Sequence, residues 1–130
     1  LKEKLQSLVD KLDLNSKIQI LNYKSDISFF YDTADVFVLT SRWEGFGNVI
    51  IESLSFGTPV VSVDCPYGPA EILKNNNLGI LVNSVKPEVI ADSILKCLKK
   101  QFDKQQLIDY SKNFSVKNQF KKYLKILNAQ

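Results

Sequence analysis

The amino-acid sequence predicts an α/β fold in which a mostly parallel sheet of about four strands is flanked by helices. Three observations predict this class. Short continuous apolar runs, typical of strands buried on both faces, recur along the chain. Segments with apolar residues at helical spacing lie between these runs, and the connecting loops are short. A hydrophobic content of 45% over 130 residues is enough for one domain with a buried core.

The predicted strands are four apolar runs, at residues 18–21, 36–39, 59–63 and 79–82. Alternation of such runs with helices indicates βαβ units, and ligands of such sheets bind beyond the carboxyl ends of the strands. The residues that follow run 36–39 are therefore the first place to expect a functional site.

Helical periodicity predicts the remaining elements. Near the start of the chain, Leu5, Leu8 and Leu12 recur at helical spacing. Ser25 or Asp26 suits the N-cap of a helix over residues 27–34. Further helices are predicted over residues 47–56, 69–73 and 103–113, from Pro87, a favoured first helical residue, and from Val116.

The stretch "TSRWEGFGNVIIESLSFGTPVV", residues 40–61, places two acids and two glycines after the second predicted strand. Glu44 and Glu52 stand eight positions apart, with Gly45-Phe46-Gly47 between them. Glycines allow a sharp turn and a close approach of backbone to a ligand. The helix that follows offers unpaired amides and a positive dipole end, and together these features favour a phosphate or diphosphate.

The second acid extends this argument. Glu52 lies about 1.5 turns into the helix, or roughly 6–8 Å along it, where a carboxylate can accept hydrogen bonds from a ribose diol. The residues thus predict a nucleoside-diphosphate ligand with its ribose on Glu52 and its remaining group near Glu44. At this level the alternative is an ordinary tight turn in which the acids only complement the helix dipole.

The composition argues against several other classes. The net charge of +3 is modest and the basic residues are spread along the chain, unlike the clustered patches of nucleic-acid binders. The chain has no histidine, which removes the usual general base and the His-dependent nucleophiles. Cys65 and Cys97 alone do not make a zinc site and are interpreted as free thiols of a reducing cytoplasm. No apolar run is long enough to span a membrane.

At the acid and glycine residues the sequence resembles a known family. "SRWEGFGNVIIESLSFGTPVVSVD" resembles the E-x7-E signature of the large retaining glycosyltransferase family with the GT-B fold, often called family four. "FFYDTADVFVLTS", "GPAEIL" followed by "NNNLGILV", and "NFSVKNQFKKYLKIL" are similar to other segments of that family, in the same order. The resemblance implies that residues 1–130 are a partial, Rossmann-like, nucleotide-sugar-binding domain, the C-terminal half of a GT-B fold without its first strands.

The resemblance also implies a role for each residue of the motif. Glu44 is the catalytic acid at the donor sugar, and Glu52 holds the ribose. The loop and helix start whose amides face the sugar and diphosphate are Gly45, Phe46, Gly47, Asn48 and Val49. Members transfer a sugar from a nucleotide donor with retention, and helix amides and basic side chains stabilise the leaving group. The implied donor is a UDP-sugar, with no metal and no other cofactor.

Four further residues are second-tier candidates. Arg42, the sole arginine, suits bidentate recognition, with a surface ion pair as the alternative. Glu71 lies at the next strand-to-helix junction, where a plain helix-start acid is the alternative. Trp43 and Tyr67 either line the sugar pocket or take part in core or loop packing.

The family's donor-binding half begins with strands that would precede Leu1. These strands would lie between residues 18–21 and 36–39 in the sheet, and the family also has an acceptor-binding N-terminal domain. We therefore expect this chain to be part of a longer enzyme, to leave a gap in its sheet, and to show no transferase turnover alone.

The implied acceptor is a glycan or lipid-linked glycan of bacterial surface polysaccharide synthesis, made in the cytoplasm at the inner face of the membrane. The basic face of the last helix either contacts that membrane or is a solvated face of a packed helix. It carries Lys117, Lys121, Lys122 and Lys125. Two other functions stay open: a nucleotide-sugar binding module without catalysis, and a sugar-nucleotide epimerase on the same fold. A receiver-like signalling domain would need an acidic cluster at its first strand, which the sequence lacks.

Overall fold

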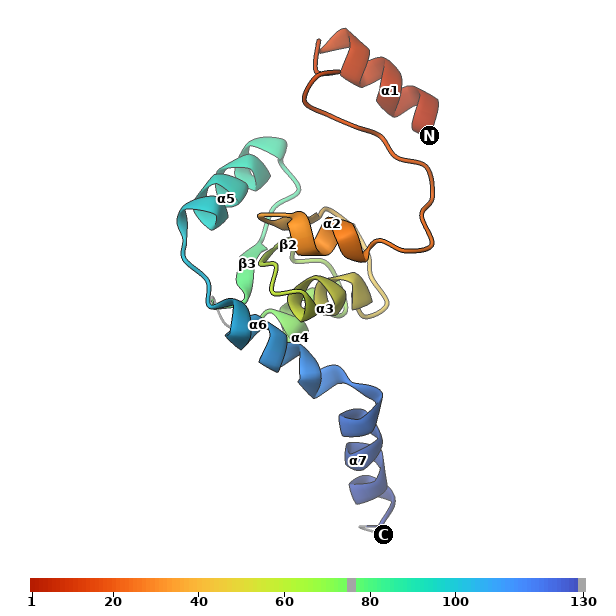
Figure 1. Cartoon of the computed structure of the whole chain (residues 1–130), viewed down its shortest axis with the longest axis vertical. Helices are drawn as coiled ribbons and strands as arrows, with labels where there is room; N and C mark the ends of the chain where they lie inside the picture. Colours follow the sequence, from red (N-terminus) through yellow and green to blue (C-terminus); the bar gives the residue numbers. More distant parts are fainter. Residues whose placement is uncertain (75–76, 129–130) are drawn as a thin grey trace.

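The structure is a computed structural model that describes residues 1–74 and 77–128. In chain order the elements are α1 (Lys2–Lys11), α2 (Ser28–Thr33), β1 (Phe37–Leu39), α3 (Asn48–Ser55), β2 (Val60–Val63), α4 (Pro69–Ile72), β3 (Gly79–Val82), α5 (Pro87–Lys99), α6 (Lys104–Ser111), a short 3-10 helix η1 (Lys112–Phe114) and α7 (Val116–Leu127) (Figure 1). The predicted α/β class with a parallel sheet and flanking helices is confirmed. Asn75 and Asn76, the first two residues of the quoted "NNNLGILV" segment, lie outside the described residues.

In the described residues the sheet contains three parallel strands in the order β1-β2-β3. Phe37 of β1 pairs with Val60 of β2, and Val60 pairs in turn with Gly79 of β3. Because the strands are parallel and in this order, their carboxyl ends meet at one edge of the sheet. The loops that follow β1 and β2 therefore emerge side by side there.

The strand predicted at residues 18–21 is wrong. Residues 18–24 form neither helix nor strand, and Ile18 and Leu21 are exposed. An extended segment becomes a strand only where a neighbour pairs with its backbone amides and carbonyls, and apolar side chains alone do not supply that neighbour. In Figure 1 this segment is part of a long connection between α1 and α2.

The prediction that β1 is buried on both faces is also corrected. All three residues of β1 are half-buried, whereas all four residues of β2 are buried. The cause is position, since β1 is an edge strand with β2 on one side only in the described part of the chain. An open apolar groove of about 500 Å³ runs beside β1, lined in part by Leu21, Ile27 and Phe30.

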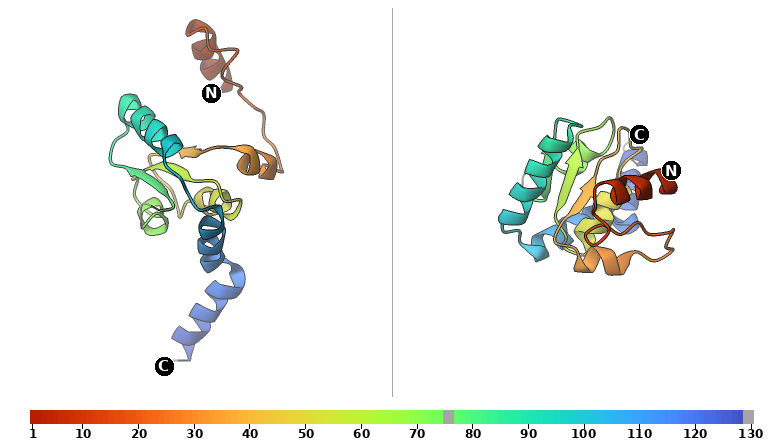
Figure 2. Two further views of the ribbon diagram at one scale, coloured as in Figure 1. Left: turned by 60° about the vertical axis from the view of Figure 1, so that its left-hand side comes forward. Right: turned by 90° about the horizontal axis from the view of Figure 1, so that it is seen from above.

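Alternation along the strands divides the core between the two faces of the sheet. On one face Val60 joins Ile50 and Leu54 of α3 and Leu107 of α6, all fully buried. On the other face Val61 packs with residues of α5. The ribbon views of Figure 2 show α5 and α3 on different sides of the sheet. Helix α3, which begins at the predicted site, is thus anchored by its apolar face.

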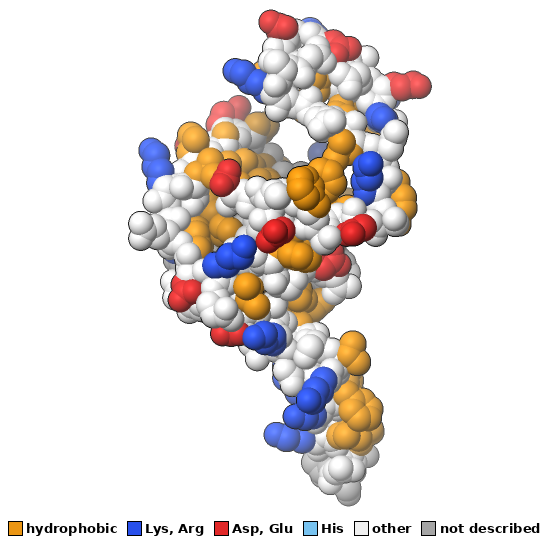
Figure 3. Space-filling view, in the orientation of Figure 1, with side chains coloured by type: hydrophobic (Ala, Val, Ile, Leu, Met, Phe, Trp, Pro, Cys, Tyr) orange, Lys and Arg blue, Asp and Glu red, His pale blue; other side chains and the backbone are white. Residues whose placement is uncertain are grey.

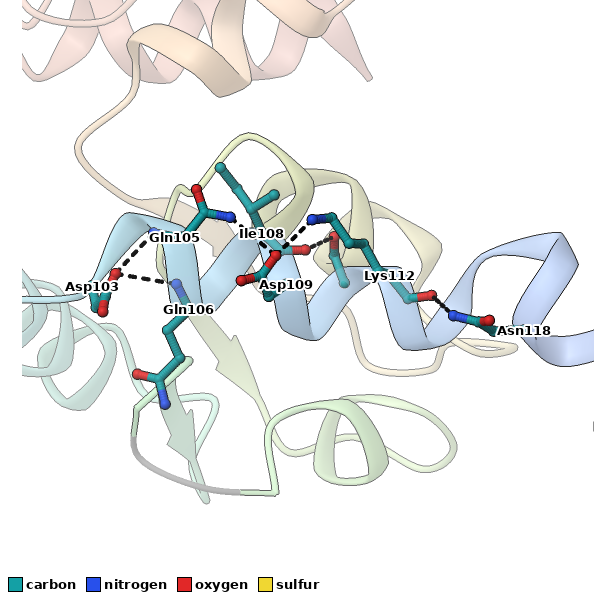
Figure 4. A network of polar contacts seen from close by, with 8 residues as sticks. Asp103, Gln105, Gln106, Ile108, Asp109, Lys112 and Asn118 are labelled. Carbon is teal, nitrogen blue, oxygen red and sulfur yellow. Dashed lines mark hydrogen bonds and ion pairs between the residues drawn. The ribbon is translucent and has the colours of Figure 1, made fainter.

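A polar network runs along helix α6 and into the residues that follow it (Figure 4). The Asp103 carboxylate accepts hydrogen bonds from the amides of Gln105 (2.9 Å) and Gln106 (3.1 Å), which makes it the N-cap of α6. At the other end, Asp109 accepts from Lys112 at 2.6 Å. Asp109 also accepts from Gln105, and both contacts lower the pKa of its carboxyl. The contact of α6 with α3 is instead apolar, through the buried Leu107.

Helix α7 projects from the body of the molecule, and its apolar side is exposed together with its lysines (Figures 1 and 3). Phe120 is 60% exposed and Leu127 is 67% exposed. No helix of the described residues is long and apolar enough to cross a membrane.

Candidate functional site

The loop that follows β1 leads into the start of α3, as predicted. Gly47 is the N-cap and adopts φ +82°, a left-handed conformation that glycine takes without strain. No side chain caps the helix, so the first amides of α3, from Asn48 and Val49, point outward without a side-chain acceptor. An uncapped helix start at the carboxyl edge of a parallel sheet favours an anionic ligand.

Glu44 lies against the segment that follows β2. Its backbone amide faces the carbonyl oxygen of Pro66 at 3.5 Å, and its side chain is half-buried. Burial raises the pKa of the neighbouring Cys65 thiol, and the negative charge of Glu44 raises it further. The fold therefore places the Glu44 carboxylate beside two adjacent strand ends, those of β1 and β2.

Gly68 is a site residue that sequence reasoning missed. It is buried, adopts φ +103°, and lies so close to the Glu44 loop that an added Cβ would be 1.9 Å from the carbonyl oxygen of Phe46. The backbone of residues 66–68 thus supports the loop directly. The sequence signal for it was a glycine in a predicted turn, directly after Tyr67. In the structure Tyr67 itself adopts a positive φ of 65° in this turn.

Phe46, a residue of the same loop, connects that loop to the residues around α6. Its ring packs on that of Phe114 with centroids 5.9 Å apart, and Phe114 packs in turn on Tyr110 of α6. Its exposed neighbour Asn48 shares with it a hollow of about 390 Å³ beside α7. Gly45, by contrast, is exposed and has no atom within 4 Å of the place where a Cβ would stand.

Glu52 faces a different part of the molecule. Its exposed carboxylate accepts a hydrogen bond of 3.0 Å from the hydroxyl of Tyr31 on α2. It borders an open groove of about 500 Å³, a volume in the range of small-molecule sites. We call this the Glu52 groove; its lining residues are Tyr23, Lys24, Ser25, Asp26, Ile27, Ser28, Tyr31, Glu52 and Phe56.

The two acids are thus separate: Glu44 lies in the loop before α3 and Glu52 lies on α3. No hydrogen bond joins Glu44 to Glu52 in residues 1–74 and 77–128. Glu44 stands at the uncapped helix start and Glu52 one turn further along, beside the groove. This arrangement suits an extended ligand with an anionic centre and a hydroxyl-bearing end.

The second-tier candidates occupy more peripheral positions. Arg42 is exposed and lines a separate hollow against α5, and Glu71 is exposed in the first turn of α4. Trp43 and Tyr67 are each 74% exposed, so neither packs in the core. Among the described residues no three His, Cys, Asp or Glu side chains cluster as metal ligands. That the reaction needs no metal stays a prediction.

Curated relatives share this segment of sequence. An uncharacterized glycosyltransferase of Methanocaldococcus jannaschii is 44% identical over 56% of this chain, and an amylovoran biosynthesis glycosyltransferase of Erwinia amylovora is 35% identical over 58%. The GtfA subunit of a UDP-N-acetylglucosamine–peptide N-acetylglucosaminyltransferase of Streptococcus agalactiae is 31% identical over 67%. The matched segments span only 18%, 21% and 17% of these relatives' own lengths.

The fold is also similar to that of a glycosyltransferase of known structure. The crystal structure of a glycosyltransferase from Rickettsia africae matches 95% of this chain, and 35% of its own, with a TM-score of 0.83 and 28% identity. The family model described as glycosyl transferases group 1 matches residues 1–114. The family model covers most of the chain and the fold agrees with it, and this chain therefore belongs to the glycosyl transferases group 1 family.

Proposed function

We propose that these 130 residues bind the nucleotide-sugar donor of a retaining glycosyltransferase, with UDP as the nucleotide. The observation that carries the proposal is the arrangement along α3: a glycine loop and uncapped amides at its start, Glu44 before it, and Glu52 at the edge of a groove. The diphosphate would lie on the amides, the ribose on Glu52 and the nucleobase further along the Glu52 groove. The UDP-linked donor in the name of the Streptococcus agalactiae relative supports UDP.

Glu44 is then the acid at the transferring sugar, a hexose or N-acetylhexosamine. It is half-buried beside the loop after β2, so a sugar placed at the helix start would contact it. The leaving diphosphate gains charge as the glycosidic bond breaks, and the α3 amides are preorganised to stabilise that charge without a metal.

We further propose an acceptor of glycan or lipid-linked type and a cytoplasmic location, where the full protein meets the inner face of the membrane. The amylovoran relative supports surface polysaccharide as the product class. Acceptor binding is assigned to parts of the enzyme other than these residues.

Replacement of Glu52 by Gln tests the ribose contact. In the natural full-length protein, Glu52→Gln should weaken UDP binding by about 1–3 kcal/mol, because a charged acceptor of ribose hydroxyls becomes a neutral amide. Isothermal titration with UDP measures the change. Glu88→Gln, at an exposed acid in the first turn of α5, is the matched control and should leave the dissociation constant unaltered. An unchanged constant in Glu52→Gln would remove the ribose role.

The 130 residues alone should bind donor without transferring sugar, since the proposed acceptor site lies elsewhere. The measurement is product formation by the purified 130-residue chain with UDP-sugars and glycan acceptors, compared with the full-length protein. Transfer onto any acceptor by this chain alone would refute the division of labour. Isomerisation of donor without acceptor by the full-length protein would favour the epimerase instead.

A further inference from the structure

Tyr31 is a buried tyrosine whose hydroxyl reaches an exposed acid of the candidate site. Its side chain is 5% exposed, yet its hydroxyl oxygen lies 3.0 Å from Oε2 of Glu52, an exposed residue. The two residues are 21 positions apart and come from α2 and α3. Among the described residues Tyr31 is the one hydrogen-bond donor to that carboxylate. Oε1 of Glu52 is left for another donor.

The position of Tyr31 is determined from three directions. Its ring stacks on Phe56 with centroids 5.9 Å apart and meets the edge of Phe37 at 5.5 Å. Its backbone carbonyl accepts a 2.5 Å hydrogen bond from the buried hydroxyl of Thr58. The Thr58 carbonyl accepts in turn from Ser53 of α3 at 3.0 Å. The hydroxyl is therefore presented by a packed scaffold, whereas an exposed glutamate would otherwise sample several rotamers.

The hydroxyl also stays a donor at ordinary pH. Burial raises the pKa of Tyr31 well above its usual value, and the hydrogen bond to Glu52 and the charge of that residue add to the effect. A neutral phenol donates to a carboxylate, whereas a phenolate would repel it. The Tyr31 hydroxyl accordingly keeps its proton at physiological pH.

From this geometry we propose that Tyr31 is a positioning residue that orients the Glu52 carboxylate toward the Glu52 groove and so sets selectivity for a ribose diol. The proposal rests on the ribose role of Glu52 proposed above. With Oε2 held by Tyr31, Oε1 and the second lone pair of Oε2 remain available to a ligand in the groove that both residues line. A vicinal diol can pair with such a fixed carboxylate at little entropic cost, and a nucleotide without the diol gains nothing from it.

The test is a comparison of two ligands in two variants. In the full-length protein, UDP and 2′,3′-dideoxy-UDP are titrated against wild type and Tyr31→Phe, which removes the hydroxyl and keeps the ring. Wild type should prefer UDP. Tyr31→Phe should lower that preference about fivefold to tenfold and leave dideoxy-UDP binding within about twofold, since one charge-assisted hydrogen bond is lost. Equal weakening of both ligands, or no change in the preference, would overturn the proposal.

Two further variants keep the result interpretable. Tyr110→Phe removes a hydroxyl that donates to the Ile72 carbonyl at 2.8 Å, outside the groove, and should leave the preference unaltered. In a Glu52→Gln background, Tyr31→Phe should have no additional effect on the preference, because Tyr31 acts through Glu52. An additional loss there would overturn the positioning role while leaving the ribose role of Glu52 intact. If wild type binds UDP and 2′,3′-dideoxy-UDP equally well, both the positioning role of Tyr31 and the ribose role of Glu52 are refuted.

Discussion

Replacement of Gly68 by alanine is expected to destabilise the protein by about 2–5 kcal/mol. The new methyl group would stand 1.9 Å from the carbonyl oxygen of Phe46 and 2.4 Å from its carbonyl carbon, and these backbone atoms cannot yield as a flexible side chain does. A φ of +103° adds strain for any residue with a Cβ. Urea unfolding of wild type and Gly68→Ala measures the difference as a shift of the midpoint.

The chain offers a matched control for this substitution. Gly45 lies in the same loop but has open space around its Cβ position, so Gly45→Ala should change stability by no more than about 0.5 kcal/mol. If Gly68→Ala folds, UDP affinity should also fall, because the clash pushes away the loop that carries Glu44 and Gly47. A Gly68→Ala protein with wild-type stability would show that the two loops do not pack as the structure has them.

Replacement of Glu44 by glutamine is expected to lower the turnover number of the full-length enzyme by about 10²–10³-fold while the dissociation constant of UDP changes little. Glutamine keeps the shape of the side chain and removes its charge. If Glu44 acts on the transferring sugar, its contribution is made mainly in the transition state, and UDP, which lacks that sugar, does not report it. Steady-state rates with the donor and UDP titrations on the same preparation separate the two quantities.

Asp92→Asn serves as the control for this charge change, because Asp92 is an exposed acid on α5 at the opposite face of the sheet. It should leave both turnover and UDP binding as in wild type. A Glu44→Gln enzyme with weaker UDP binding and normal turnover under saturating donor would assign Glu44 to binding rather than to catalysis.

Many of the elements were predictable from the sequence because their signals are local. Residues 79–82 coincide with β3, and run 59–63 contains β2. The helices predicted from Pro87 and Val116 begin at those residues. Ser115 caps the last helix with its hydroxyl. A buried strand in a parallel sheet is a continuous apolar run, and a helix start is marked by its cap or proline, so a window of a few residues contains the information.

Other predictions failed where the outcome depended on a distant neighbour. Run 18–21 has the composition of a strand but no pairing partner in the described chain, and β1 is half-buried because only β2 flanks it. Asp26 was a candidate N-cap for α2, but the helix has Ile27 at that position. The Asp26 carboxylate instead accepts from the amide of Ser28 at 2.9 Å. The predicted and observed N-caps of α2 differ by one residue, and assigned helix ends commonly vary by that much.

The sequence by itself determined the α/β class, the order of the elements after α1, and the position of both glutamates on one loop and one helix. Only the tertiary structure decided that Glu44 lies beside the segment after β2, that Gly68 has no room for a side chain, and that Tyr31 holds Glu52. The reason is physical: periodicity and capping act within a turn or two of chain. Contacts between separate loops and helices depend on strand order and on which face each helix buries.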